Sequence, residues 1–194
     1  MTGTLYITGN EQADSLLNAD GNALLIGMLL DQQVPMEWAF AGPNTLKQRL
    51  GHLDPTKIAA MDVDEFVTIC CEKPAIHRFP GSMGKRIHSM GEGLVADYDG
   101  EARNLWADAI DGRELYKRLK ALPGYGDEKS KIFVALLGKT QGVQPDGWRE
   151  AAGKFGDDVP RSVADVTDEV SLGKVREWKK AQKAAKKDKQ DRPL

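Results

Sequence analysis

Residues 115–138 constrain the fold most tightly, because two stretches with helical spacing are separated by only a few residues. The segment is LYKRLKALPGYGDEKSKIFVALLG, and its first amphipathic run ends at Leu122, directly before Pro-Gly-Tyr-Gly. Two glycines that flank one apolar residue permit a tight turn with positive φ. We therefore predict a helical hairpin in which Leu122 and Tyr125 pack the turn against both helices.

The two glycines of this turn, Gly124 and Gly126, place backbone amides beside the N-terminus of the second helix. Amides in that position can bind one anion together, and a phosphate of the DNA backbone is a suitable anion. Such a contact does not depend on the DNA sequence. Lys129 and Lys131 lie in the first turns of the second helix, and we predict that they join the DNA contact. A plain helical hairpin with a glycine turn remains the alternative.

The rest of the chain predicts an all-α fold, because Gly and Pro separate short apolar patterns with helical spacing. Further helices are expected at about 20–30, from Pro35 with Trp38, Ala39 and Phe40 inward, from Asp54-Pro55, and at 62–71, 81–97, 105–119, 130–137 and 171–189. Only residues 4–8 alternate like a strand, and a single strand builds no sheet. We expect two helical bundles that flank a cleft, with a boundary near Gly100.

The charge is distributed unevenly over a chain of 194 residues, a length typical of one domain. Residues 171–194 hold nine basic and three acidic side chains, a net charge of +6, whereas the remainder carries −8. We therefore expect a helical domain at 1–170 and a basic C-terminal helix or tail at 171–194. Such a tail indicates a polyanionic partner, and a solvated terminal helix explains the charge equally well.

The cysteines and the apolar runs exclude several classes of protein. Cys70 and Cys71 are adjacent, where a disulfide between them would be strained, and no Cys-x-x-Cys pair is present. A zinc site or iron–sulfur cluster with four cysteine ligands is therefore excluded. No apolar run approaches the roughly 20 residues of a membrane span. No signal peptide is apparent at the N-terminus, so we expect a cytoplasmic protein without a membrane contact.

The hairpin segment resembles the helix-hairpin-helix of the HhH-GPD superfamily of base-excision-repair DNA glycosylases. A second likeness lies at residues 24–40, LLIGMLLDQQVPMEWAF, where Gln32 and Gln33 take the place of the Gln pair that ends an early helix of the family. A third lies after the hairpin, where Asp146 occupies the place of the family's catalytic aspartate. The three likenesses follow one another in the family's order and span residues 24–150.

The resemblance implies a monofunctional DNA N-glycosylase without lyase activity. Bifunctional members carry a nucleophilic Lys where this chain has Glu128, and Lys129 lies about 100° further round the helix. Many relatives follow the catalytic aspartate with a Thr-His pair, whereas this chain has Gly147 and Trp148. The family's cysteine-ligated cluster is absent. The likeness is to a cluster-free, actinobacterial-type subgroup, and it implies no cofactor apart from a monovalent cation at the hairpin.

Cleavage of the bond between base and sugar passes through an oxocarbenium-like sugar, which a carboxylate stabilises while it orients the attacking water. Asp146 is the first candidate for this carboxylate, and a turn that caps the next helix is the alternative role for it. Asp31 is the second candidate, for which a structural hydrogen bond at a helix end is equally consistent.

A base must leave the DNA stack before its bond to the sugar becomes accessible. Gln32 or Gln33 would fill the gap that it leaves, and capping of their own helix is the alternative. Trp148 and Trp38 are candidates for a base pocket, and core packing is the alternative for both.

The implied partner is double-stranded DNA with a damaged base, bound by a monomer that associates with the nucleoid. Two other functions remain: a non-catalytic double-stranded DNA-binding protein of the same fold, and an unrelated helical protein that contacts a partner through its basic tail.

Overall fold

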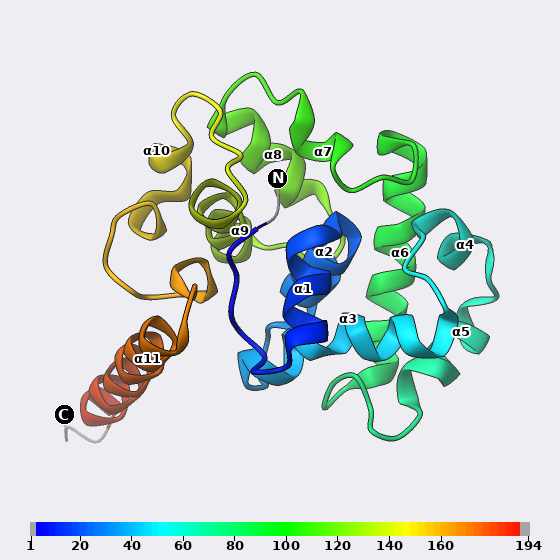
Figure 1. The fold of residues 1–194 in the computed structure, drawn as a ribbon, viewed down its shortest axis with the longest axis horizontal. Helices are drawn as coiled ribbons and strands as arrows, with labels where there is room; N and C mark the ends of the chain where they lie inside the picture. The colour runs from blue at the N-terminus through cyan, green and yellow to red at the C-terminus, as the bar shows by residue number, and fades with distance from the viewer. Residues whose placement is uncertain (1–2, 191–194) are drawn as a thin grey trace.

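The protein consists of helices gathered in two lobes, and Figure 1 shows α4, α5 and α6 on one side and α8–α11 on the other. The computed structural model describes residues 3–190, with side chains through residue 185. The helices are α1 (Glu11–Ala19), α2 (Gly21–Leu30), α3 (Met36–Leu50), α4 (Pro55–Ala60), α5 (Val63–Cys71), α6 (Pro80–Tyr98), α7 (Asn104–Ala107), α8 (Gly112–Ala121), α9 (Asp127–Thr140), α10 (Trp148–Ala152), η1 (Gly153–Phe155), η2 (Val163–Asp165) and α11 (Glu169–Gln190). Residues 3–190 contain no β-strand, which confirms the all-α prediction.

Several helices begin where the sequence supplies a capping side chain. Asp20 accepts hydrogen bonds from the backbone at the start of α2, and Asp54, Asp62 and Asp111 do the same for α4, α5 and α8. These bonds satisfy amides that have no partner within the helix. Helix α6 covers the predicted stretch 81–97 and extends one residue beyond it at each end. It ends before Asp99 and Gly100, which both have positive φ.

Helix α2 joins the two lobes, and almost all of its residues are buried. It packs against α1, α3 and α6, while Tyr125 of the other lobe bonds to a carbonyl in its middle and Lys129 to two carbonyls in its last turn. On the side of the second lobe, α9 is the central helix, in contact with α8, α10 and η2. This arrangement places the C-terminal end of α2 beside the start of α9.

The N-terminal segment before α1 is extended and lies across the second lobe. The Thr4 amide donates to the Thr140 carbonyl and the Tyr6 amide donates to the Val166 carbonyl, both at 3.1 Å. Between them, the Leu5 amide donates to Oδ1 of Asn18 at 2.8 Å. The single strand-like stretch of the sequence therefore forms no sheet, as predicted, and links α1 to the end of α9 and to η2.

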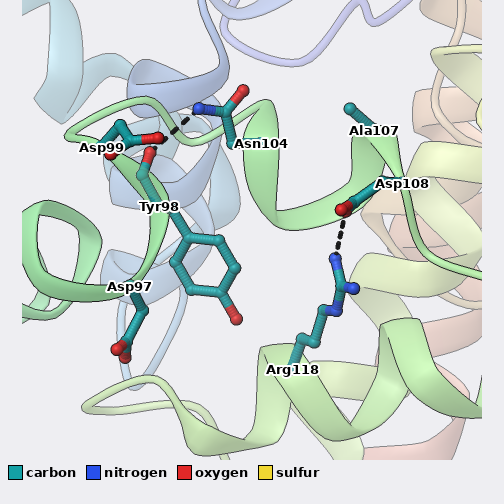
Figure 2. Close-up of a pocket in the computed structure, with 7 residues that line it drawn as sticks. All are labelled: Asp97, Tyr98, Asp99, Asn104, Ala107, Asp108 and Arg118. Atoms are coloured by element: carbon teal, nitrogen blue, oxygen red, sulfur yellow. Dashed lines mark hydrogen bonds and ion pairs between the residues drawn. The ribbon is translucent and has the colours of Figure 1, made fainter.

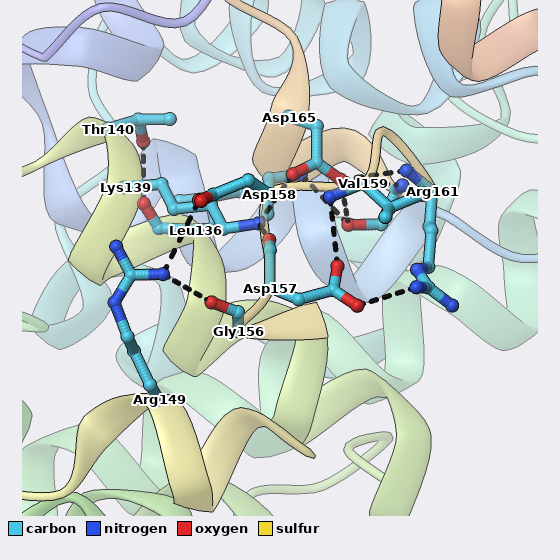
Figure 3. A network of polar contacts seen from close by, with 12 residues as sticks. Leu136, Lys139, Thr140, Arg149, Gly156, Asp157, Asp158, Val159, Arg161 and Asp165 are labelled. Carbon is cyan, nitrogen blue, oxygen red and sulfur yellow. Dashed lines mark hydrogen bonds and ion pairs between the residues drawn. The ribbon is translucent and has the colours of Figure 1, made fainter. Parts of the chain in front are cut away.

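A buried ion pair ties the chain that follows α10 to α9 (Figure 3). Nζ of Lys139 lies 2.6 Å from Oδ1 of Asp165, and the two side chains are only 14% and 8% exposed. Oδ2 of Asp165 accepts from the amides of Arg161 and Ser162 at 2.9 and 3.0 Å, completing a capping box at η2. The pair therefore fixes the approach to α11 on the central helix of this lobe.

Two sequence expectations differ from the fold. Helix α1 was not predicted, although the Asn10 side chain caps it and Leu16 and Leu17 are buried. Trp38 was expected to face inward with Ala39 and Phe40, but it is 41% exposed, whereas the other two are buried.

Arg192 and the side chains of Lys186, Lys187 and Lys189, which belong to the predicted basic tail, lie outside the described part of the protein.

Candidate nucleic-acid interface

The turn between α8 and α9 spans residues 122–126 and uses its two glycines differently. Gly124 has φ +84°, a left-handed conformation that favours glycine. Gly126 has φ −89° and ψ −179°, which any residue adopts, so only Gly124 uses the positive φ that the two glycines permit. A Cβ atom at Gly126 would have no neighbour within 4 Å. The missing side chain therefore leaves the backbone open to a ligand at this position.

The turn is anchored from inside by its two apolar residues. Leu122 and Tyr125 are buried, as predicted. The Tyr125 hydroxyl donates to the Leu25 carbonyl of α2 at 2.8 Å, and the ring lies edge-on to Phe133, with centroids 5.9 Å apart. Burial raises the pKa of Tyr125 well above its ordinary value, so the hydroxyl stays a donor. The hairpin is thus fastened to the helix that carries the glutamines at its end.

The N-terminus of α9 has no side-chain cap, so its first amides remain available. The nearest acidic side chain, Asp127, accepts from the Tyr116 hydroxyl and from Nζ of Lys131 at 3.0 Å, and it lies 3.9 Å from Nζ of Lys120. These partners hold the pKa of Asp127 below its ordinary value. Lys131 therefore neutralises a carboxylate at the rim of the turn, on the exposed side of the hairpin.

Lys129 faces the opposite way, toward the protein interior. Its Nζ donates to the carbonyls of Met28 and Leu29 at 2.7 Å each, in the last turn of α2. Burial lowers the pKa of Lys129 to about 8. The side chain therefore caps α2 and brings a positive charge next to Asp31, rather than reaching into solvent for a phosphate.

The two glutamines after α2 have different environments. Nε2 of Gln32 donates to the Leu29 carbonyl at 2.8 Å, and its Oε1 accepts from Nη1 of Arg86 at 3.2 Å. Its backbone carbonyl also lies 2.8 Å from Nε2 of His77. Gln33 is exposed and has φ +58°, an unusual conformation for a residue with a side chain. Gln32 is thus held against α6, whereas Gln33 projects from the surface.

An open groove of about 770 Å³ runs beside these glutamines, between the loop that follows α2 and the helix α11. Its lining residues are Asp31, Gln32, Gln33, Val34, Pro35, Met36, Glu37, Arg176, Lys179, Lys180 and Lys183. One wall is therefore basic and belongs to α11. Arg176 pairs with Glu37 at 2.6 Å, which holds α11 against the start of α3. The volume falls within the range of ligand pockets.

Asp146 lies away from the groove and from the glutamines that line it. Its backbone carbonyl accepts from the Gly112 amide at 2.8 Å and forms an isolated bridge with Asp111, the N-cap of α8. Because the glycine turn follows the C-terminal end of α8, Asp146 sits at the other end of the hairpin. It lines a separate hollow of about 570 Å³ with Arg113 and Glu150. The structure does not bring Asp146 together with Gln33 or the hairpin glycines.

Residues 26–191 match the model of the family described as HhH-GPD superfamily base excision DNA repair protein. The chain belongs to this superfamily. No curated protein and no solved structure matches it. The matched range includes the hairpin, the Gln pair and α11, and it confirms the resemblance found in the sequence. Membership implies glycosylase-type function in base excision DNA repair, with DNA as substrate. No helix among the described residues is long and apolar enough to cross a membrane.

The two tryptophans considered for a base pocket lie outside the groove of this HhH-GPD protein. Trp148 is 8% exposed and packs on Gly138 of α9, where a Cβ atom would come within 2.4 Å of the indole. Nε1 of Trp38 donates to the Ala75 carbonyl at 3.1 Å. Trp148 therefore has the core-packing role that was the alternative for it, whereas Trp38 is 41% exposed and bonds across to the segment that contains Ala75.

A further hollow of about 560 Å³, drawn in Figure 2, lies between the end of α6 and α8. Asp97, Asp99 and Asp108 give it an acidic lining, and Arg118 is already paired with Asp108 at 2.6 Å. An acidic hollow whose arginine is already paired repels phosphate, so this hollow is unsuited to a DNA backbone.

Sequence reasoning did not single out five basic side chains that lie at the glycine turn or the groove. Arg86 lies beside the glycine turn and bonds to Gln32, while the groove is lined by four basic side chains of α11: Arg176, Lys179, Lys180 and Lys183. The basic character of residues 73–88 and of the C-terminal tail was the available signal. It could not identify individual residues, because their proximity depends on packing between distant helices.

Proposed function

We propose that this HhH-GPD protein is a monofunctional DNA N-glycosylase, which hydrolyses the bond between a damaged base and deoxyribose in double-stranded DNA. One observation carries the proposal: the glycine turn, the glutamines and the groove all surround the C-terminal end of α2. A phosphate held by the amides of Gly126 and Asp127 would set the DNA in place. Gln33 would then enter the gap, and the flipped nucleotide would occupy the groove.

The absence of lyase chemistry is supported by the environment of the amines near the turn. A lyase needs an amine that attacks C1′ of the sugar. Glu128 stands on the exposed side of α9, and Nζ of Lys129 is bound by two carbonyls of α2. We retain the expectation of a cytoplasmic, nucleoid-associated monomer that needs no cofactor other than a monovalent cation at the hairpin.

The test is base release from a panel of duplexes, each with one defined lesion, alkylated purines first. We expect at least one lesion to yield free base and an abasic site, with strand cleavage only after alkali. Borohydride should trap no covalent complex. Strand cleavage without alkali, or a trapped complex, would show lyase activity and contradict the monofunctional assignment.

The second candidate is a non-catalytic double-stranded DNA-binding protein of the same fold. The distance of Asp146 from the hairpin turn favours it, because the family's catalytic position is then not at the groove. Tight duplex binding without base release from any lesion would establish this candidate and exclude the glycosylase.

Replacing Gln33 by glycine separates its conformational cost from its proposed insertion into DNA. Glycine relieves the positive φ at this position, so we expect the free energy of unfolding to rise by about 1 kcal/mol. Loss of the inserting side chain should slow base release on the order of 10-fold, equivalent to about 1.4 kcal/mol. Denaturant unfolding and single-turnover base release measure the two effects. Gln33→Asn, which keeps an amide and tolerates positive φ, should lose less activity. An unchanged rate in Gln33→Gly would exclude insertion.

A further inference from the structure

We propose that Asp31, and not Asp146, supplies the carboxylate that acts on the sugar during base release. The assignment rests on the proposed glycosylase function and adds the identity of the catalytic residue. It follows from where Asp31 lies, from what surrounds it and from what its position costs the fold.

Asp31 lies directly at the groove. It is the C-cap of α2 and lines the groove together with Gln33, two residues further along the same loop. A nucleotide displaced by Gln33 therefore enters the groove beside the Asp31 carboxylate. Asp146, by contrast, is exposed on a separate hollow with Glu150 and Arg113, and no residue of the groove lines that hollow.

The position of Asp31 is unfavourable for folding. A carboxylate at the C-terminal end of a helix faces the negative end of the helix dipole. Burial raises the pKa of Asp31, and the nearby Glu37 adds to the rise. Within the described residues, no hydrogen bond supports the carboxylate, so the structural role considered for it has no partner. Charged groups held in positions that are unfavourable for folding are typical of functional sites.

Positive charges from two other helices favour the ionised form of the Asp31 carboxylate. Lys179 of α11 and Lys129 of α9 both lower the pKa of Asp31, opposing burial and Glu37. Glu37 is itself paired with Arg176. Lys180 and Lys183 line the same wall and are placed to meet DNA phosphates. The site thus offers one carboxylate in a basic groove, which suits a cationic sugar that is attached to two phosphates.

The reaction step balances with water as the only co-reactant. The bond between C1′ and the base nitrogen breaks, and its electron pair leaves with the base. Ionised Asp31 stabilises the resulting positive charge on the sugar. Water then forms a bond to C1′ and gives a proton to Asp31. Asp31 then passes this proton to the departing base, directly or through solvent, which restores the carboxylate.

The decisive experiment compares Asp31→Asn with Asp146→Asn on whichever lesion the wild type processes. We expect Asp31→Asn to lower single-turnover base release at least about 100-fold. Duplex binding and thermal stability should be kept or improved, because an unfavourable charge is removed. Asp146→Asn, with an equal change of charge, should stay within about twofold of wild type, which is below 0.5 kcal/mol.

A pH profile adds a readout that a purely structural role would not move. Base release requires ionised Asp31, so its rate falls as pH drops through the pKa of Asp31. Lys179→Met removes a charge that lowers this pKa, so the acidic limb should shift to higher pH. Lys183 lies further along α11 and is not one of the charges that shift the pKa of Asp31, so Lys183→Met is the matched control and should leave the limb in place.

The outcomes separate the assignment from the function on which it rests. If Asp146→Asn abolishes base release while Asp31→Asn retains it, or if both retain it, the assignment is overturned and the glycosylase function stands. If Asp31→Asn does not fold, an unshifted acidic limb in Lys179→Met overturns the assignment. If the wild type releases no base from any lesion, the proposed function fails and the assignment falls with it.

Discussion

Gly126→Asp is expected to weaken binding to undamaged duplex DNA by roughly 30-fold at low salt, about 2 kcal/mol, without unfolding the protein. The backbone at Gly126 is extended, and a Cβ atom there meets nothing within 4 Å. Aspartate is also a favoured N-cap, so the stability of α9 should change by only a few tenths of a kcal/mol. The new carboxylate would instead stand at the amides proposed to hold a phosphate.

The control for this prediction is Gly126→Asn, which caps α9 as well but adds no charge. Fluorescence anisotropy titrations of both variants at several salt concentrations would isolate the charge effect, and circular dichroism would report on the fold. We expect the asparagine variant to bind much closer to wild type. Equal affinity of Gly126→Asp and wild type would place the phosphate contact somewhere other than the start of α9.

Asp165→Ala should lower the free energy of unfolding by about 3–5 kcal/mol, because it leaves Lys139 buried without its charge partner. The substitution also removes the acceptor for the amides of Arg161 and Ser162. Urea denaturation at neutral pH measures the loss. Asp158→Ala is the matched control. Asp158 also forms an ion pair, with Arg149 at 3.5 Å, but its side chain is 94% exposed to solvent. That control should cost less than about 1 kcal/mol, and equal losses for the two variants would contradict the role of the buried pair.

Local patterns predicted the helices well, because capping residues and apolar spacing act over a few residues. The stretch at 81–97 and the hairpin around Leu122 and Tyr125 were identified in this way. Helix α1 escaped prediction although Asn10 caps it, since its short apolar pattern is weak on its own. The backbone at Gly126 could not be inferred, because one positive φ, at Gly124, is enough to close the turn.

The site was less predictable, because it depends on which helix ends meet in space. The spacing between the hairpin and Asp146 matches the family, yet the loop after α9 pairs Asp146 with Asp111 at the far end of the hairpin. The direction of Lys129 toward α2 and the wall that α11 adds to the groove also arise from tertiary packing. Sequence reasoning named Asp31 and Gln33 as candidates, and only the structure distinguishes their surroundings from those of Asp146 and Gln32.

The extended N-terminal segment has a consequence for the order in which the protein is completed during synthesis. Its amides at Thr4 and Tyr6 bond to the carbonyls of Thr140 and Val166, far away along the chain of 194 residues. Contacts between such distant residues close the largest loops and form late. Residues 4–6 are therefore synthesised well before their partners, and their contacts with the second lobe cannot be complete until residue 166 has emerged.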